Sequence, residues 1–327
     1  MKKKHKVLLI TIIITLLVSV LFLGWGLNIN NYQYNLKRRT VQILAILVAS
    51  ICTGYTSVAF QTITQNQILT PSVMGLESLY RFLQTFVVFI FGMDRAANMN
   101  PHIEFFITVI LMVSMSIILF KVIFRSGSEN LYFVVLLGII MGTLFNGLST
   151  SFIMMLNPNE FLAVQESLFA SVNSVNKDLL SVSALIVLAV MLLSIRDYRN
   201  LDVANLGRNM SLNLGVDYNT FIKSVFIKIA VLVSISTVLI GPISFLSIIV
   251  VSIARRIICT YEHKYFIFEA SLLSFIFLVM GTWILRVLFN NATQLSVLIN
   301  FIGGSYFLYL LIRNAQYGRK SLRRTGK

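Results

Sequence analysis

The sequence predicts an all-α, polytopic integral membrane protein with about ten transmembrane helices. Apolar residues make up 57% of the 327 residues and charged residues only 12%, about half the charged share of a typical soluble domain. Residues 40–76 and 287–312 contain no charged residue and no histidine. Since a helix that crosses a bilayer needs about 20 mostly apolar residues, each stretch can hold at least one. A soluble enzyme is therefore excluded, and residues 1–327 are expected to form a single transmembrane domain.

The first apolar run follows a basic start, in the manner of a signal peptide. The run is about 21 residues long and no small-residue cleavage site follows it, so a retained helix is expected. Charge clusters and Gly, Pro and Asn residues separate the later runs. Backbone groups in lipid must be hydrogen-bonded within their own segment, which makes helix the expected form of every span. The predicted spans are 7–27, 41–60, 73–92, 103–124, 131–156, 179–195, 220–240, 242–258, 265–288 and 295–313.

The positions of the basic residues indicate the orientation of these spans. An even number of spans puts both termini on one side, and about 20 of the 27 Lys and Arg residues fall on that side. Because cytoplasmic loops are enriched in Lys and Arg, both termini are predicted to be cytoplasmic. The net charge of +15 then needs no nucleic acid to explain it. Lys37, Arg38 and Arg39 form a basic cluster on the outer side, which either an external acidic partner or lipid headgroups would explain.

The sequence lacks the motifs of nucleotide hydrolysis, of membrane-embedded catalysis and of metal binding. The chain has no Gly-rich phosphate loop with a following Lys-Ser/Thr, so ATP hydrolysis is not expected of it. No Ser/His/Asp or paired-carboxylate arrangement lies within the spans, which disfavours a membrane-embedded enzyme. Cys52 and Cys259 are interpreted as apolar fillers rather than a disulfide. The three histidines lack ligand spacing, so neither a metal site nor a cofactor is predicted.

Arg81 lies within the third predicted span and is counted on neither side of the membrane. A central arginine costs about 2.5–3.5 kcal/mol on insertion scales. Glu77 lies four residues earlier, on the same helical face, and an internal ion pair between the two is preferred over a contact with a transported substrate.

Four segments resemble signatures of one family. Residues 61–75 read QTITQNQILTPSVMG, residues 206–216 LGRNMSLNLGV, residues 241–255 GPISFLSIIVVSIAR and residues 302–311 IGGSYFLYLL. In this order they resemble the FecCD-type permeases, which import iron-siderophores, haem and cobalamin. Glu262-His263-Lys264 fits a further Asp-His-Arg stretch of the family. The likeness reaches from about residue 38 to 313 and implies an ATP-binding-cassette (ABC) importer permease in a bacterial cell membrane.

The chain also departs from the family pattern. Gln67 replaces a proline, Val251-Ser252 a Pro-His pair and Thr282 an aspartate. These departures indicate the catecholate-siderophore branch rather than the cobalamin branch. Import of haem or cobalamin stays open as an alternative, as does a secondary, ion-coupled transporter, for which Glu77 and Glu269 are the acidic residues near spans.

The resemblance implies a cytoplasmic coupling segment, about residues 196–219, that docks into a separate ATP-binding subunit. Its two glycines punctuate a short helix, and the second is suited to a C-terminal cap. The alternative is an ordinary interfacial helix. The predicted coupling residues are Leu206, Gly207, Ser211, Leu214, Gly215 and Val216.

Two further partners follow from the resemblance: an external substrate-binding protein and a second permease subunit, either an identical copy or a paralogue. Acidic residues of the binding protein are expected to meet arginines at the outer mouth, namely Arg38, Arg39 and Arg286. The fifth span is small and polar for mid-membrane, although its glycines also suit close helix packing. The residues predicted to line the translocation path are Gly142, Asn146, Ser149 and Thr150.

Overall fold

Helices are the regular secondary structure of the part of the chain that the structure, a computed structural model, describes: residues 2–25, 32–97, 100–125, 131–173, 175–290 and 292–325. This confirms the all-α fold class. In chain order the helices are α1 (Lys2–Gly24), α2 (Tyr32–Ile63), the 3-10 helix η2 (Pro71–Met74), α3 (Leu76–Ala97), α4 (Pro101–Arg125), α5 (Leu131–Ile153), α6 (Pro158–Ser167), α7 (Lys177–Ser194), α8 (Asp197–Ala204), α9 (Arg208–Asn213), α10 (Tyr218–Ile240), α11 (Leu246–Ile258), α12 (His263–Leu288) and α13 (Leu295–Thr325).

Each predicted span overlaps one of these helices. Within the described residues, seven helices are long and apolar enough to cross a membrane by length and composition: α1, α2, α4, α5, α7, α10 and α12. The other three predicted spans fall on α3, which carries two charges in its first turns, on α11, which has only 13 residues, and on α13, whose apolar part is Leu295–Tyr309. The count of ten spans stays a prediction.

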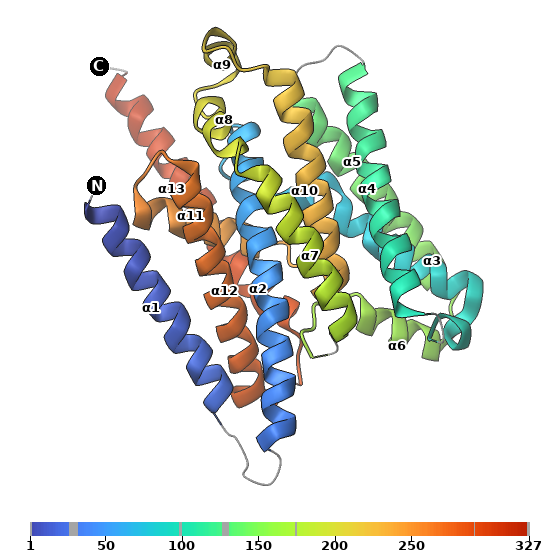
Figure 1. The fold of residues 1–327 in the computed structure, drawn as a ribbon. Coiled ribbons are helices and arrows are strands. Elements are labelled where there is room, and N and C mark those ends of the chain that lie inside the picture. The colour runs from blue at the N-terminus through green and yellow to red at the C-terminus, as the bar shows by residue number, and fades with distance from the viewer. Residues whose placement is uncertain are drawn as a thin grey trace.

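Helix α2 lies at the centre of the bundle, between α12, α10 and α7 (Figure 1). It packs most extensively against α12, because Gly54 removes the side chain at the crossing. A Cβ atom at Gly54 would lie 2.6 Å from the backbone nitrogen of Ser271 and 2.7 Å from its Cα atom. Helix α1 lies on the outside of this group against α12, and many of its apolar side chains are exposed in the isolated chain. Such a surface suits lipid.

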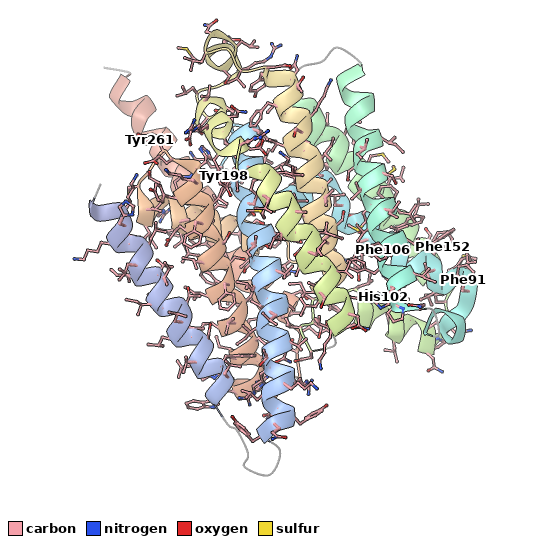
Figure 2. All side chains as sticks on the ribbon, viewed as in Figure 1. Phe91, His102, Phe106, Phe152, Tyr198 and Tyr261 are labelled. Carbon is pink, nitrogen blue, oxygen red and sulfur yellow. The ribbon has the colours of Figure 1, made fainter. Side chains whose placement is uncertain are left out.

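Helices α3, α4, α5 and α6 form the other side of the molecule (Figure 1). A cluster of phenylalanines holds α3 to α5, with the ring of Phe152 centred 4.7 Å from Phe89 and 5.7 Å from Phe86. Figure 2 shows Phe152 at this side of the molecule, together with Phe91, Phe106 and His102. Helix α10 packs against α4 and α3 and so joins this side of the molecule to the group around α2.

The connection between α5 and α7 contains a helix that the sequence analysis did not predict. Helix α6 has ten residues, too few to span a bilayer. Pro158 starts it, and the carboxylate of Glu160 accepts a hydrogen bond from the backbone N–H of Asn157 (3.1 Å). This is the reciprocal half of a capping box, a local signal readable from the Asn-Pro-Asn-Glu sequence.

The N-terminal end of α1 and the C-terminal end of α13 lie at the end of the bundle that carries α8 and α9 (Figure 1). This arrangement agrees with an even number of crossings. We refer to it as the coupling end, and to the opposite end, where α1 meets α2, as the outer end. Of the two cysteines, Cys52 is buried in α2, whereas Cys259 is exposed at the end of α11 and is not the apolar filler expected.

Candidate functional site

The predicted coupling segment folds into two short helices, α8 and α9, at the coupling end (Figure 1). Gly215 follows α9 with a φ of 82°, in the left-handed region that glycine favours. The N–H of Gly215 donates to the carbonyl of Leu212 (3.0 Å), and the N–H of Val216 donates to that of Ser211 (3.1 Å). These two bonds make a Schellman motif, so the prediction of a glycine cap at this position is confirmed.

Ser211 joins α9 to α8 through a hydrogen bond. Its side chain is fully buried, and its hydroxyl donates to the carbonyls of Val203 (3.1 Å) and Gly207 (2.7 Å). With Ser211 turned inward, large apolar side chains of this segment face outward. They are Leu206, Met210, Leu212 and Leu214, between 46% and 61% exposed, and we call them the α9 surface. Exposed apolar side chains of this kind suit contact with a partner protein or with membrane lipid.

Helix α8 is tied to the transmembrane bundle through Asp197. One of its carboxylate oxygens accepts hydrogen bonds from the hydroxyl of Tyr55 on α2 (3.1 Å) and from the ammonium of Lys228 on α10. Asp197 and Tyr55 are 6% and 0% exposed. Next to them, burial raises the pKa of Tyr198 above its ordinary value; Figure 2 places Tyr198 at the coupling end.

A second tie runs through Asp202 to the start of α12. One oxygen of Asp202 lies 2.7 Å from the backbone nitrogen and 2.6 Å from the Nδ1 atom of His263. The Nε2 atom of the same ring lies 2.9 Å from the hydroxyl of Thr62, near the end of α2. In addition, the side-chain amide of Gln65 donates to the carbonyl of Ala204 (2.9 Å). We call Asp202, His263 and Thr62 the α8 latch.

The loop after α9 is capped as well. The Asp217 carboxylate accepts a hydrogen bond from the backbone N–H of Thr220 (3.3 Å) and starts α10. Hydrogen bonds from Thr220 hold the pKa of Asp217 below its ordinary value. Hydrogen bonds therefore join α8 to α2, α10 and α12, and the chain that follows α9 continues directly into the capped start of α10.

The sequence analysis assigned no contact to Asp197 or Asp202, and it found no ligand spacing around His263. All three make long-range contacts, which no local pattern reports. One signal was available: Lys228 lies within the apolar run 220–240, where a cation requires a partner.

At the outer end, the three arginines predicted to meet a binding protein differ in their surroundings. Arg39 is 7% exposed, and its guanidinium donates to the carbonyls of the last turn of α1, at Phe22, Leu23 and Trp25 (2.7–3.2 Å). Arg286 donates to Gln42 (3.0 Å) and lies over the Phe22 ring. Arg38 is exposed. Of the three, Arg38 is the one whose side chain faces outward.

The residues predicted to line the path are not brought together in one wall. Gly142 packs against α3, and a Cβ atom there would lie 3.3 Å from the Cα atom of Gly75. Ser149 is fully buried, with its hydroxyl 2.9 Å from that of Thr85. Asn146 is exposed and donates to the hydroxyl of Ser78 (3.0 Å). Thr150 is exposed, and its hydroxyl donates to the Asn146 carbonyl. Gly142 and Ser149 thus hold α5 to α3, and the role of the four in transport stays a prediction.

Asn146 does line a cavity of about 650 Å³, which we call the Arg81 cavity. Its walls come from η2 and the start of α3, from α6 and the residues after it, from the break before α11, and from α13. The polar and charged residues that line it are Thr70, Ser72, Glu77, Ser78, Arg81, Asn146, Gln165, Ser244, Ser296 and Asn300.

Glu77 and Arg81 both lie in this wall. The two oxygens of Glu77 accept hydrogen bonds from the hydroxyls of Ser72 (2.8 Å) and Ser244. Arg81 is exposed, and it lies one helical turn further along α3. Glu77 is therefore held by serine hydroxyls, and the side chain of Arg81 is accessible.

A model of the FecCD transport family matches residues 6–313. The chain belongs to this family. It is 42% identical over 304 residues to the petrobactin import system permease protein YclO of Bacillus subtilis, an alignment that covers 92% of this chain and 96% of the relative. It is 34% identical over 311 residues to the petrobactin import system permease protein FatC of Bacillus anthracis, covering 92% and 88%.

Solved structures agree on the fold. A chain described as an inward-facing conformation of a metal-chelate type ABC transporter superposes with a TM-score of 0.82. The match covers 94% of this chain and 99% of that one at 19% identity, and therefore shows the fold alone. FecCD family members are multi-pass membrane proteins, as the apolar helices of this chain require.

Proposed function

We propose that this chain is the membrane-spanning permease subunit of an ABC importer that carries iron(III)-siderophore complexes into the cytoplasm. The observation that carries the proposal is the 42% identity, along almost the whole of both chains, to a petrobactin import permease. Ferric petrobactin is accordingly the first cargo to test. Haem and cobalamin are the next candidates.

ATP hydrolysis is assigned to a separate subunit. The α9 surface offers that subunit four exposed apolar side chains, and burial of apolar area is the main favourable contribution to most protein–protein association. Closure of two ATPase subunits would displace α9, and the ties of α8 would pass the displacement to α2, α10 and α12. A second permease subunit, identical or paralogous, completes this assembly.

An external binding protein would deliver the cargo at the outer end. Arg38 is the first candidate for contact with its acidic residues, because its side chain is exposed. Arg39 and Arg286 instead hold α1 and α2 in place, which shapes the surface that the binding protein meets. Exposed charge pairs of this type mainly set the association rate and register.

The test is uptake of radiolabelled iron by cells that lack this chain, presented on a panel of siderophores. Wild-type, Gly215→Pro and Leu214→Ser copies are returned in parallel. Proline cannot adopt the φ of 82° at residue 215, so the α9 cap is lost. Leu214→Ser leaves the backbone intact and makes the α9 surface less apolar. Met154→Ser is the matched control, because Met154 follows α5 and its side chain is 80% exposed.

Wild type and Met154→Ser are expected to restore uptake of one siderophore class, Gly215→Pro none, and Leu214→Ser less than half. Restoration by Gly215→Pro would contradict the coupling role. If every iron complex enters normally without the chain, the siderophore assignment is wrong, and haem and cobalamin are tested next.

A further inference from the structure

Three interruptions of the helical backbone converge on the Arg81 cavity. They are residues 68–75 before α3, residues 168–169 after α6 and residues 242–245 before α11. Non-helical backbone at membrane depth is tolerated where it is buried in protein or lines a water-filled cavity. Transporters place their substrate sites at such broken helices. The volume, about 650 Å³, lies within the range of small-molecule sites.

The two charges in this cavity are opposite in sign, and the exposed one is positive. Among the described residues that line it, Arg81 is the one base and Glu77 the one acid. Each Glu77 oxygen already accepts a hydrogen bond from a serine, Ser72 or Ser244. Arg81 is exposed and presents up to five N–H donors in a planar fork. A negatively charged, oxygen-rich ligand therefore matches the accessible group.

Aromatic side chains form part of the same walls. Phe169, Phe245 and Phe307 line the cavity, and the ring centroids of Phe245 and Phe307 lie 6.4 Å apart. Gly303 allows this wall to close, since a Cβ atom there would lie 2.4 Å from the Cβ atom of Phe245. Flat aromatic rings pack favourably against such side chains in offset or edge-to-face arrangements.

We propose that Arg81 contacts the cargo directly and makes the cavity selective for anionic aromatic iron chelates, that is, ferric catecholates. Each catecholate group brings two negative charges, so two or three such groups outweigh the three positive charges of one iron(III) ion, and the complex is an anion with exposed aromatic edges. Pathways for anions are lined by Arg or Lys, because a fixed cation offsets the loss of hydration. This inference rests on the proposed function and names the residue that recognises its substrate.

The test uses the complete transporter, with its ATPase and binding protein, reconstituted in liposomes and supplied with iron-labelled ferric petrobactin. Wild type is compared with Arg81→Gln, Arg81→Lys and the control Lys177→Gln, an exposed cation at the start of α7 that does not line the cavity. Loss of one charge-assisted contact predicts at least about a tenfold fall in uptake for Arg81→Gln. Arg81→Lys is expected to recover to within about threefold of wild type, and Lys177→Gln to match it.

Two further measurements distinguish direct contact with the cargo from a structural role of Arg81. They are the thermal stability of the complex and the ATPase rate stimulated by the loaded binding protein. Both are expected to stay unchanged in Arg81→Gln. Uptake by Arg81→Gln equal to wild type would overturn the inference, as would equal loss of uptake in Arg81→Gln and Arg81→Lys together with lowered thermal stability. If wild type carries no ferric siderophore at all, the proposed function itself fails, and the assignment of Arg81 fails with it.

Discussion

Removing the carboxylate of Asp202 is expected to uncouple ATP hydrolysis from transport. Asp202→Ala deletes both contacts of this carboxylate with His263, at 2.7 and 2.6 Å, and frees the ring that reaches Thr62. A hydrogen bond to a charged group contributes about 1.5–3 kcal/mol. Because the two contacts share one oxygen of a carboxylate that is 30% exposed, we take about 2 kcal/mol for the pair. This corresponds to about a thirtyfold change in the equilibrium constant between the state with the Asp202–His263 contacts and the state without them.

The assay is the amount of iron transported per ATP hydrolysed by the reconstituted complex. Asp202→Ala is expected to keep the ATPase rate within about twofold, because the α9 surface is unchanged, while transport per ATP falls about tenfold or more. Asp202→Asn retains an oxygen acceptor and is expected to be intermediate. Asp178→Ala, an exposed acid in the first turn of α7, is the control. Normal transport per ATP in Asp202→Ala would refute the idea that α8 transmits the motion through this latch.

Two further predictions concern the bundle itself. Gly54→Ala forces a Cβ atom to within 2.7 Å of backbone atoms of Ser271, so the free energy of unfolding is expected to fall by about 1–3 kcal/mol. Gly147→Ala is the control and is expected to change stability little, because a Cβ atom there meets open space. Equal melting temperatures of the two variants would contradict the α2–α12 packing. Glu269→Gln keeps the shape and the acceptor for the Thr11 hydroxyl (2.8 Å), so ATP-driven uptake is expected within about twofold of wild type. Loss of transport with intact ATP hydrolysis in Glu269→Gln would instead favour ion coupling through this carboxylate.

Properties that depend on local sequence were predictable. The apolar runs located the helices, and Gly215, eight residues after Gly207, correctly indicated a helix cap. The contacts of Asp197 and Asp202 were not predictable, because their partners lie between 31 and 142 residues away in the chain. Sequence spacing reports neighbours on one helix, whereas these bonds join different helices.

The outer arginines illustrate the same limit. The sequence places Arg38 and Arg39 side by side and gives no reason to separate them, yet consecutive residues of a helix point about 100° apart. One therefore faces the solvent, and the other reaches the last turn of α1. Likewise, the spacing of Glu77 and Arg81 predicted an ion pair on one face, and Arg81 does attract the Glu77 carboxylate electrostatically. The spacing gave no sign of Ser244, 167 residues away, which supplies one of the hydrogen bonds to Glu77.

The distribution of polar groups divides the chain into a part suited to transmit force and a part suited to change shape. At the coupling end, Asp197 and Asp202 of α8 are hydrogen-bonded to Tyr55 of α2, Lys228 of α10 and His263 of α12, so that α2, α10 and α12 are expected to move with α8. The Arg81 cavity is instead bounded by three helix breaks, where backbone dihedrals can change without breaking a continuous ladder of helical hydrogen bonds. Motion that enters through α9 is therefore expected to appear as rearrangement of the walls around Arg81, which is where a cargo must be released.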